Sequence, residues 1–105
     1  MGKTIHERLK YHFENKKFCK LERQVAAHIL EDTGGYIVDV SDNFVVMQEV
    51  EDFQVLGFLI FPIPTIVKVR NSVSDKYYDK IVRLEKLIDK IGKKHNVVRI
   101  VYGQQ

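Results

Sequence analysis

The sequence predicts a single α+β domain in which a small antiparallel barrel is flanked by helices. Residues 25–67 contain no Lys or Arg and carry most of the β-branched and aromatic alternation that is typical of strands. Residues 75–91 change to the 3.6-residue period of an amphipathic helix. With 105 residues and 45% hydrophobic composition, the chain has enough apolar side chains for one modest core.

The N-terminal segment predicts a short helix from about Thr4 to Glu14. Thr4 is followed three residues later by Glu7, the spacing of a capping box, in which each side chain binds a backbone N–H left free at the start of a helix. Residues 18–24 fit either a helix or an edge strand, and the alternation of Cys19, Leu21 and Arg23 favours the strand.

The barrel core is predicted to span residues 18–70. Two strand-like runs, residues 34–40 and 44–50, are joined by three turn-forming residues, Ser41 to Asn43, and therefore predict a hairpin. The apolar run from Phe53 to Phe61 predicts a buried strand with a bulge or bend at Gly57. Two prolines in residues 62–64 lack the N–H that a ladder needs, so a tight corner is expected before a strand at residues 65–70. The aromatic residues Phe44 and Phe58 are expected in the core.

The C-terminal part predicts a long amphipathic helix and a final short strand. Ser74 is the expected N-cap, the helix spans residues 75–91, Gly92 ends it, and the strand covers residues 97–102. One apolar stripe along the helix is expected to dock on the barrel. It consists of Tyr77, Ile81, Leu84, Ile88 and Ile91.

Two segments resemble the motifs of the Sm-like family. Gly35 to Met47 resembles the glycine, alternating strand, Asp-containing turn and second strand of the first Sm motif. Residues 55–67 resemble the glycine, turn and closing strand of the second motif. The resemblance implies an SH3-type small barrel, as in bacterial Sm-like proteins of unassigned function that share the Asp-Phe link found here at residues 52–53. Val45 replaces the base-reading Asn of RNA-binding members, and Leu56 and Phe58 flank the glycine in place of Arg or Lys, so the resemblance does not extend to the uridine pocket.

Charge is segregated along the chain. Its net value is +3, but residues 1–24 carry +4, residues 25–67 carry −7 and residues 68–105 carry +6. An acidic barrel rim beside basic helices is the expected explanation, and the alternative is a dipolar surface that steers a charged partner. An alternative function is RNA or DNA binding by the basic termini, because their cations could contact phosphates. The candidate residues are Lys80, Arg83, Lys86, Lys93 and Lys94.

The sequence contains no motif for catalysis, a cofactor or a metal. The four histidines lack ligand spacing. Lys17, Lys20 and His28 are near Cys19, the only cysteine, but no order of Cys, His and Asn suggests a protease, so a half-buried structural thiol is expected. The hairpin acids are expected to form a solvated rim rather than a cation site; they are Asp39, Asp42, Glu49, Glu51 and Asp52. The single cysteine and the absence of a signal peptide or membrane span predict a cytoplasmic location. The predicted function is a non-enzymatic binding or assembly module that contacts a protein partner or self-associates through a barrel edge.

Overall fold

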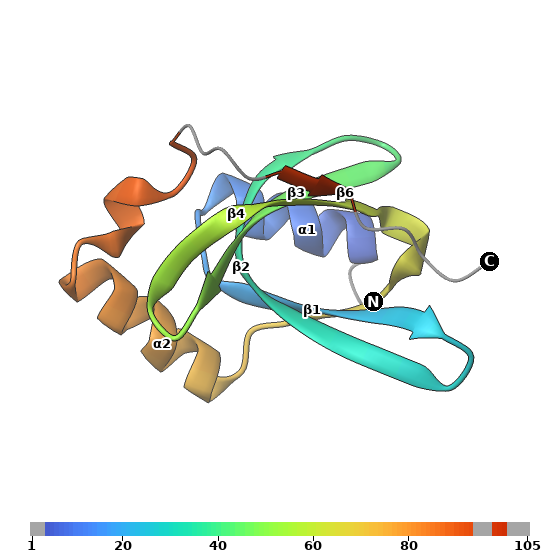
Figure 1. The fold of residues 1–105 in the computed structure, drawn as a ribbon, viewed down its shortest axis with the longest axis horizontal. Helices are drawn as coiled ribbons and strands as arrows, with labels where there is room; N and C mark the ends of the chain where they lie inside the picture. Colours follow the sequence, from blue (N-terminus) through green and yellow to red (C-terminus); the bar gives the residue numbers. More distant parts are fainter. Residues whose placement is uncertain (1–3, 94–97, 101–105) are drawn as a thin grey trace.

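A computed structural model describes residues 4–93 and 98–100, and shows one sheet with helices on both faces (Figure 1). The strand order is β5-β1-β2-β3-β4-β6; neighbours among β1 to β5 are antiparallel, and β6 is parallel to β4. In chain order the elements are α1 (Ile5–Glu14), β1 (Cys19–Ala26), β2 (Ile29–Val40), β3 (Phe44–Glu51), β4 (Gln54–Pro62), η1 (Ile63–Thr65), β5 (Ile66–Arg70), α2 (Val73–Leu84), η2 (Leu87–Lys90) and β6 (Val98–Ile100).

The sheet is open, so the predicted barrel is wrong. A closed barrel requires the first and last strands of the sheet to pair with each other. In the described chain, β5 pairs with β1, whereas the far side of β4 pairs with β6 through residues 58–60 and 98–100. The curved sheet instead packs around α1, whose Leu9 is completely buried against it. Helix α1 therefore covers one face of the sheet, where it contacts β2 and β5.

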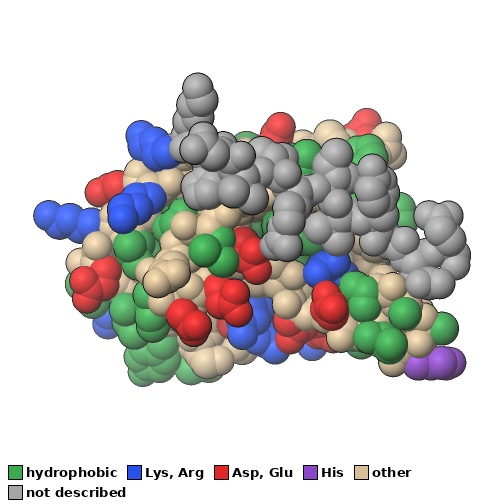
Figure 2. Space-filling model, viewed as in Figure 1, with side chains coloured by type: hydrophobic (Ala, Val, Ile, Leu, Met, Phe, Trp, Pro, Cys, Tyr) green, Lys and Arg blue, Asp and Glu red, His purple; other side chains and the backbone are tan. Residues whose placement is uncertain are grey.

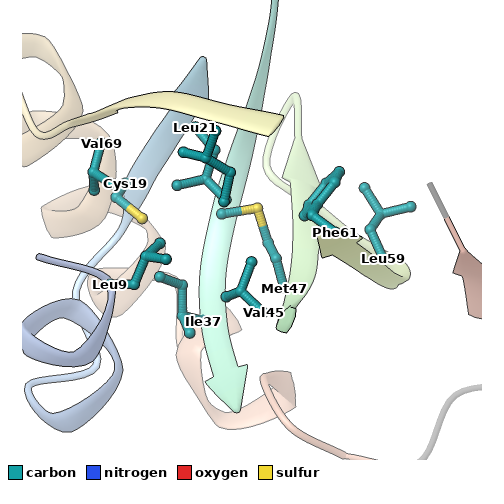
Figure 3. Close-up of a cluster of buried hydrophobic side chains, with 10 residues drawn as sticks. Leu9, Cys19, Leu21, Ile37, Val45, Met47, Leu59, Phe61 and Val69 are labelled. Atoms are coloured by element: carbon teal, nitrogen blue, oxygen red, sulfur yellow. The ribbon is translucent and has the colours of Figure 1, made fainter. Parts of the chain in front are cut away.

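The two faces of the sheet carry separate hydrophobic clusters. The first cluster lies against α1, and Figure 3 shows Met47 at its centre, near Leu21 and Val45. The second cluster lies against α2 and η2 and includes Phe18, Tyr36 and Val82. Strand residues alternate between these clusters, as the two-residue period of a strand requires.

Several local predictions are confirmed. Thr4 caps α1 in a reciprocal capping box with Glu7, and residues 19–26 form strand β1 rather than a helix. The β2–β3 turn falls at residues 41–43, and the proline corner is the 3-10 turn η1. The β3–β4 register shifts between Gln48 and Val50, where residues 56–57 of β4 lie opposite Glu49 alone, so the bulge falls at Gly57 as expected. The prediction that Phe44 is a core residue is wrong, because its side chain is 46% exposed. Phe58 is half-buried.

The C-terminal helix is shorter than predicted. Its N-cap is Ser72 rather than Ser74, and it ends at Leu84 instead of continuing to residue 91. Lys86 then adopts a left-handed backbone conformation with φ of 60°, which breaks the helix before η2. Strand β6 covers residues 98–100 of the predicted strand 97–102, whose other residues lie outside the described part of the chain.

Gln48 ties the segment after η2 to the sheet. Its side chain is buried, its Nε2 donates to the Leu56 carbonyl at 3.1 Å, and its Oε1 accepts from the Gly92 N–H at 2.6 Å. Both ends of the amide are therefore satisfied inside the fold. No helix in the described part of the chain is long and apolar enough to cross a membrane.

Candidate functional site

An acidic cleft lies where β2, the β3–β4 turn and the first turn of α2 meet. Its volume is ≈ 340 Å³. Five carboxylates and one lysine line it together with smaller and aromatic side chains. The lining residues are Phe18, Lys20, Asp32, Thr33, Gly34, Glu49, Val50, Glu51, Asp52, Ser74, Asp75 and Tyr78.

Aromatic rings join the β3–β4 turn to α2 at the side of this cleft. The rings of Phe53 and Tyr78 stack with centroids 4.4 Å apart, and the Tyr78 hydroxyl accepts the Phe53 N–H at 2.8 Å. Phe18 contacts the same tyrosine with a centroid distance of 4.7 Å. Asp52 and Phe53 both have positive φ, so the turn is tight and holds the acidic pair at residues 51–52 beside α2.

The deepest carboxylate of the cleft, Asp75, serves the fold. Its Oδ2 accepts from the Ser72 N–H at 2.8 Å and from Arg70 Nε at 3.1 Å. Burial alone would raise the pKa of this carboxyl, but the hydrogen bonds from Ser72 and Arg70 outweigh burial and hold it below the usual value. Asp75 is thus an ionised capping residue of α2 rather than a group free to bind a ligand.

Replacing Asp75 with asparagine is expected to destabilise the protein by about 2 to 3 kcal/mol at pH 7, because it removes charged hydrogen bonds from a site that is 2% exposed. A lowered folded-state pKa contributes stability that is complete above the unfolded pKa and disappears as pH falls through the folded pKa. The difference in the free energy of unfolding between the parent and Asp75→Asn should therefore become smaller below about pH 4. Urea unfolding at pH 7 and pH 3 measures this change. Asp42→Asn in the exposed β2–β3 turn is the control. A loss of stability in Asp75→Asn that is equal at both pH values would contradict the role assigned to Asp75.

The structure separates the acids that the sequence grouped on the hairpin. Glu49, Glu51 and Asp52 line the cleft, whereas Asp39 and Asp42 lie at the opposite end of β3. Among residues 4–93 and 98–100, no group of three or more His, Cys, Asp or Glu is arranged to hold a metal ion.

Three of the remaining chemical candidates, His6, His12 and Cys19, serve the fold. His12 is buried and its Nδ1 donates to the Arg8 carbonyl at 2.9 Å, while His6 Nε2 donates to the Ser41 carbonyl at 3.0 Å. Cys19 is completely buried, and burial raises the pKa of its thiol to about 12. A thiol with this pKa is a poor nucleophile at neutral pH. His95 lies outside the described part of the chain.

The most exposed apolar side chains of α2 include three that were expected to be buried, Tyr77, Ile81 and Leu84. Val73 is 70% exposed, Tyr77 64%, Ile81 41% and Leu84 71%. These four residues, which we call the α2 stripe, recur every three or four positions and therefore share one helix face. In Figure 2, hydrophobic side chains gather at the lower left, where Figure 1 places α2. The prediction that Tyr77, Ile81 and Leu84 dock on the sheet is wrong, although Ile88 is half-buried and Ile91 is buried.

Helix α2 docks through a face that carries two carboxylates. Val82 is completely buried on this face, and Asp75 binds Arg70 from the same side. Asp79 accepts hydrogen bonds from the Tyr36 hydroxyl and from Arg83 Nε, the latter at 3.2 Å. Because Tyr36 is completely buried, its hydroxyl needs this partner, and burial raises the pKa of Tyr36 far above the usual value. These polar anchors turn the α2 stripe toward solvent.

The basic residues suggested for nucleic-acid binding do not share one role. Arg83 binds Asp79 and the Lys16 carbonyl, so it is engaged in the fold. Lys86 occupies the left-handed position between α2 and η2. Lys80 and Lys93 are exposed, and Lys94 lies outside the described residues.

No family model, curated protein or solved structure matches this chain. The α2 stripe is therefore the feature on which the proposed function rests.

Proposed function

We propose that the protein is a small, non-enzymatic cytosolic module that binds another protein surface through the α2 stripe. The observation that supports this proposal is the exposure of Val73, Tyr77, Ile81 and Leu84 on a helix that already docks by its other face. Single exposed apolar side chains are ordinary, but four on one face form a patch of the kind that marks interaction sites. The single, buried Cys19 is compatible with a reducing compartment.

The sheet edges are less suitable for such an interaction. Outer strand β5 has only five residues, carries Lys68 and Arg70, and follows the proline corner at residues 62–64. Short strands with cations and nearby prolines resist pairing with another strand. The outer side of β4 is paired with β6 through residues 58–60. We therefore place the contact on the helix face.

Site-specific photo-crosslinking tests the proposed function. A photoreactive phenylalanine analogue at Tyr77, which is 64% exposed, should form covalent adducts with protein in expressing cells, and the adducts should survive nuclease treatment. The same analogue at Tyr11, an exposed aromatic on α1 across the sheet, should give few adducts. Equal yields at the two positions, or adducts at Tyr77 that nuclease abolishes, would argue against a protein-binding stripe.

A further inference from the structure

The α2 stripe runs between a basic flank and an acidic flank. Lys76 and Lys80 are exposed at i, i+4 spacing and border the stripe next to Val73 and Leu84. The β3–β4 turn lies on the other side, because its Phe53 is stacked on Tyr78 of α2. The acidic flank consists of Glu51 and Asp52 in this turn and Glu85 at the end of α2, all of which are exposed. In Figure 2, acidic side chains border the hydrophobic group at the lower left.

We infer that the α2 stripe pairs with the same stripe of a second copy of this chain, with the two α2 helices parallel and related by a two-fold axis along their length. This inference rests on the proposed function. A two-fold axis parallel to the helices places the basic flank of each copy against the acidic flank of the other. An antiparallel pair has its axis perpendicular to the helices and brings like flanks together, so Lys76 and Lys80 would face their own counterparts. Charge complementarity therefore selects the parallel arrangement.

The exposed area sets the strength of this contact. The four side chains of the stripe present on the order of 400 Å² of largely apolar surface, a typical size for the largest patch on a monomer. A standard interface buries about 800 Å² on each partner, so the charged flanks must supply much of the remainder. The twelve residues of α2 extend about 18 Å, which allows only about three turns of contact. The dimer is accordingly weak, and it forms with rising concentration.

An anionic membrane suits this surface less well than a second copy. Lys76 and Lys80 would attract anionic headgroups, but Glu51, Asp52 and Glu85 on the opposite side would be brought to the same headgroups and repelled. The stripe has positive charge on one side and negative charge on the other. A second copy carries both signs of charge as well, so each flank can face the opposite sign.

Sedimentation equilibrium of the full chain tests self-association. The average mass should rise from one chain toward two between about 10 μM and 1 mM, and 0.5 M NaCl should shift the rise to higher concentration because it screens unlike charges. Leu84→Ser should raise the concentration at which the mass increases at least tenfold, while Leu30→Ser should leave that concentration unchanged. Leu30 is 52% exposed at the tip of the β1–β2 hairpin and provides a matched loss of an exposed leucine. Lys76→Glu with Lys80→Glu should also abolish the rise, whereas Lys10→Glu on α1 should leave it intact.

Cysteine crosslinking tests the orientation of the helices. In a parallel two-fold pair, each stripe residue lies near the same residue of the other copy. Leu84→Cys alone and Val73→Cys alone should therefore each form a disulfide between the two copies under diamide oxidation. An antiparallel pair would crosslink only a mixture of the two variants. The native Cys19 is buried and should not react, which circular dichroism and the unmodified parent can verify.

Two results would overturn the inference. A mass that stays at one chain up to 1 mM excludes the second copy, and preferential crosslinking of the mixed cysteine variants excludes the parallel orientation. A monomeric chain that binds vesicles containing phosphatidylserine would assign the stripe to a membrane. If the chain is monomeric but Tyr77 still crosslinks to other proteins, the proposed function stands and self-pairing alone fails.

Discussion

Truncation of Phe61 to alanine is expected to lower the free energy of unfolding by about 3 to 5 kcal/mol. The Phe61 ring is completely buried in the cluster between the sheet and α1. The guanidinium of Arg23 lies 4.5 Å from the ring centroid, so truncation also removes a cation–π contact. The loss should be large because the surrounding strands are fixed by their ladders and can close the cavity only in part.

Phe44→Ala provides the matched control for Phe61→Ala. Phe44 is 46% exposed at the first position of β3, so its truncation should cost less than about 1 kcal/mol. Urea unfolding followed by far-UV circular dichroism compares the two variants directly. Similar costs at both positions would show that Phe61 is less buried, or Phe44 more buried, than the structure describes.

Gly35→Ala is expected to destabilise the protein by about 3 kcal/mol or more, or to prevent folding. A Cβ built on Gly35 would lie 2.1 Å from the Gln48 carbonyl oxygen on β3. That oxygen belongs to the backbone of a strand whose Gln48 side chain is itself fixed at both ends. Relief of the clash therefore requires separation of β2 from β3 at a point where Gly35 pairs with Glu49.

Gly34→Ala separates this clash from the general effect of replacing a strand glycine. A Cβ on Gly34 would lie 2.9 Å from Cζ of the Phe18 ring, which is a side-chain atom at the wall of the cleft. The ring can shift into that space, so the cost should be smaller than at Gly35. Thermal melting and soluble yield of the two variants provide the comparison, and a more severe effect at Gly34 would contradict the explanation.

Local signals predicted the individual elements well because each depends on neighbouring residues. The Thr4–Glu7 capping box, the turn at residues 41–43 and the proline corner all lie within a few positions of the element that they define. Closure of the sheet depends instead on what pairs with the outer side of β4. The partner, β6, is about 40 residues away along the chain, and no local pattern distinguishes a closing strand from an added one.

The exposed face of α2 could not be predicted from periodicity alone. The helical period was predicted correctly. The face that packs on the sheet, however, is the one with Val82, Asp75 and Asp79, and the apolar stripe is exposed. Asp75 is buried and Asp79 half-buried, because Arg70 and Tyr36 reach them from β5 and β2. In the sequence these acids look like ordinary solvated residues. The only signal in the sequence for the docked face was that a second helix face, which carries carboxylates, lies next to the apolar stripe.

The hydrogen bond between the Phe53 amide and the Tyr78 hydroxyl makes that amide a reporter of α2 docking. At 2.8 Å, its acceptor is an aromatic side chain of the helix rather than the backbone of the sheet. Exchange of the Phe53 amide with deuterium therefore requires only that the helix lift from the β3–β4 turn, whereas strand amides exchange when the ladder opens. Comparison of the Phe53 protection factor with those of β3 and β4 would give the free energy of this partial opening separately from global unfolding.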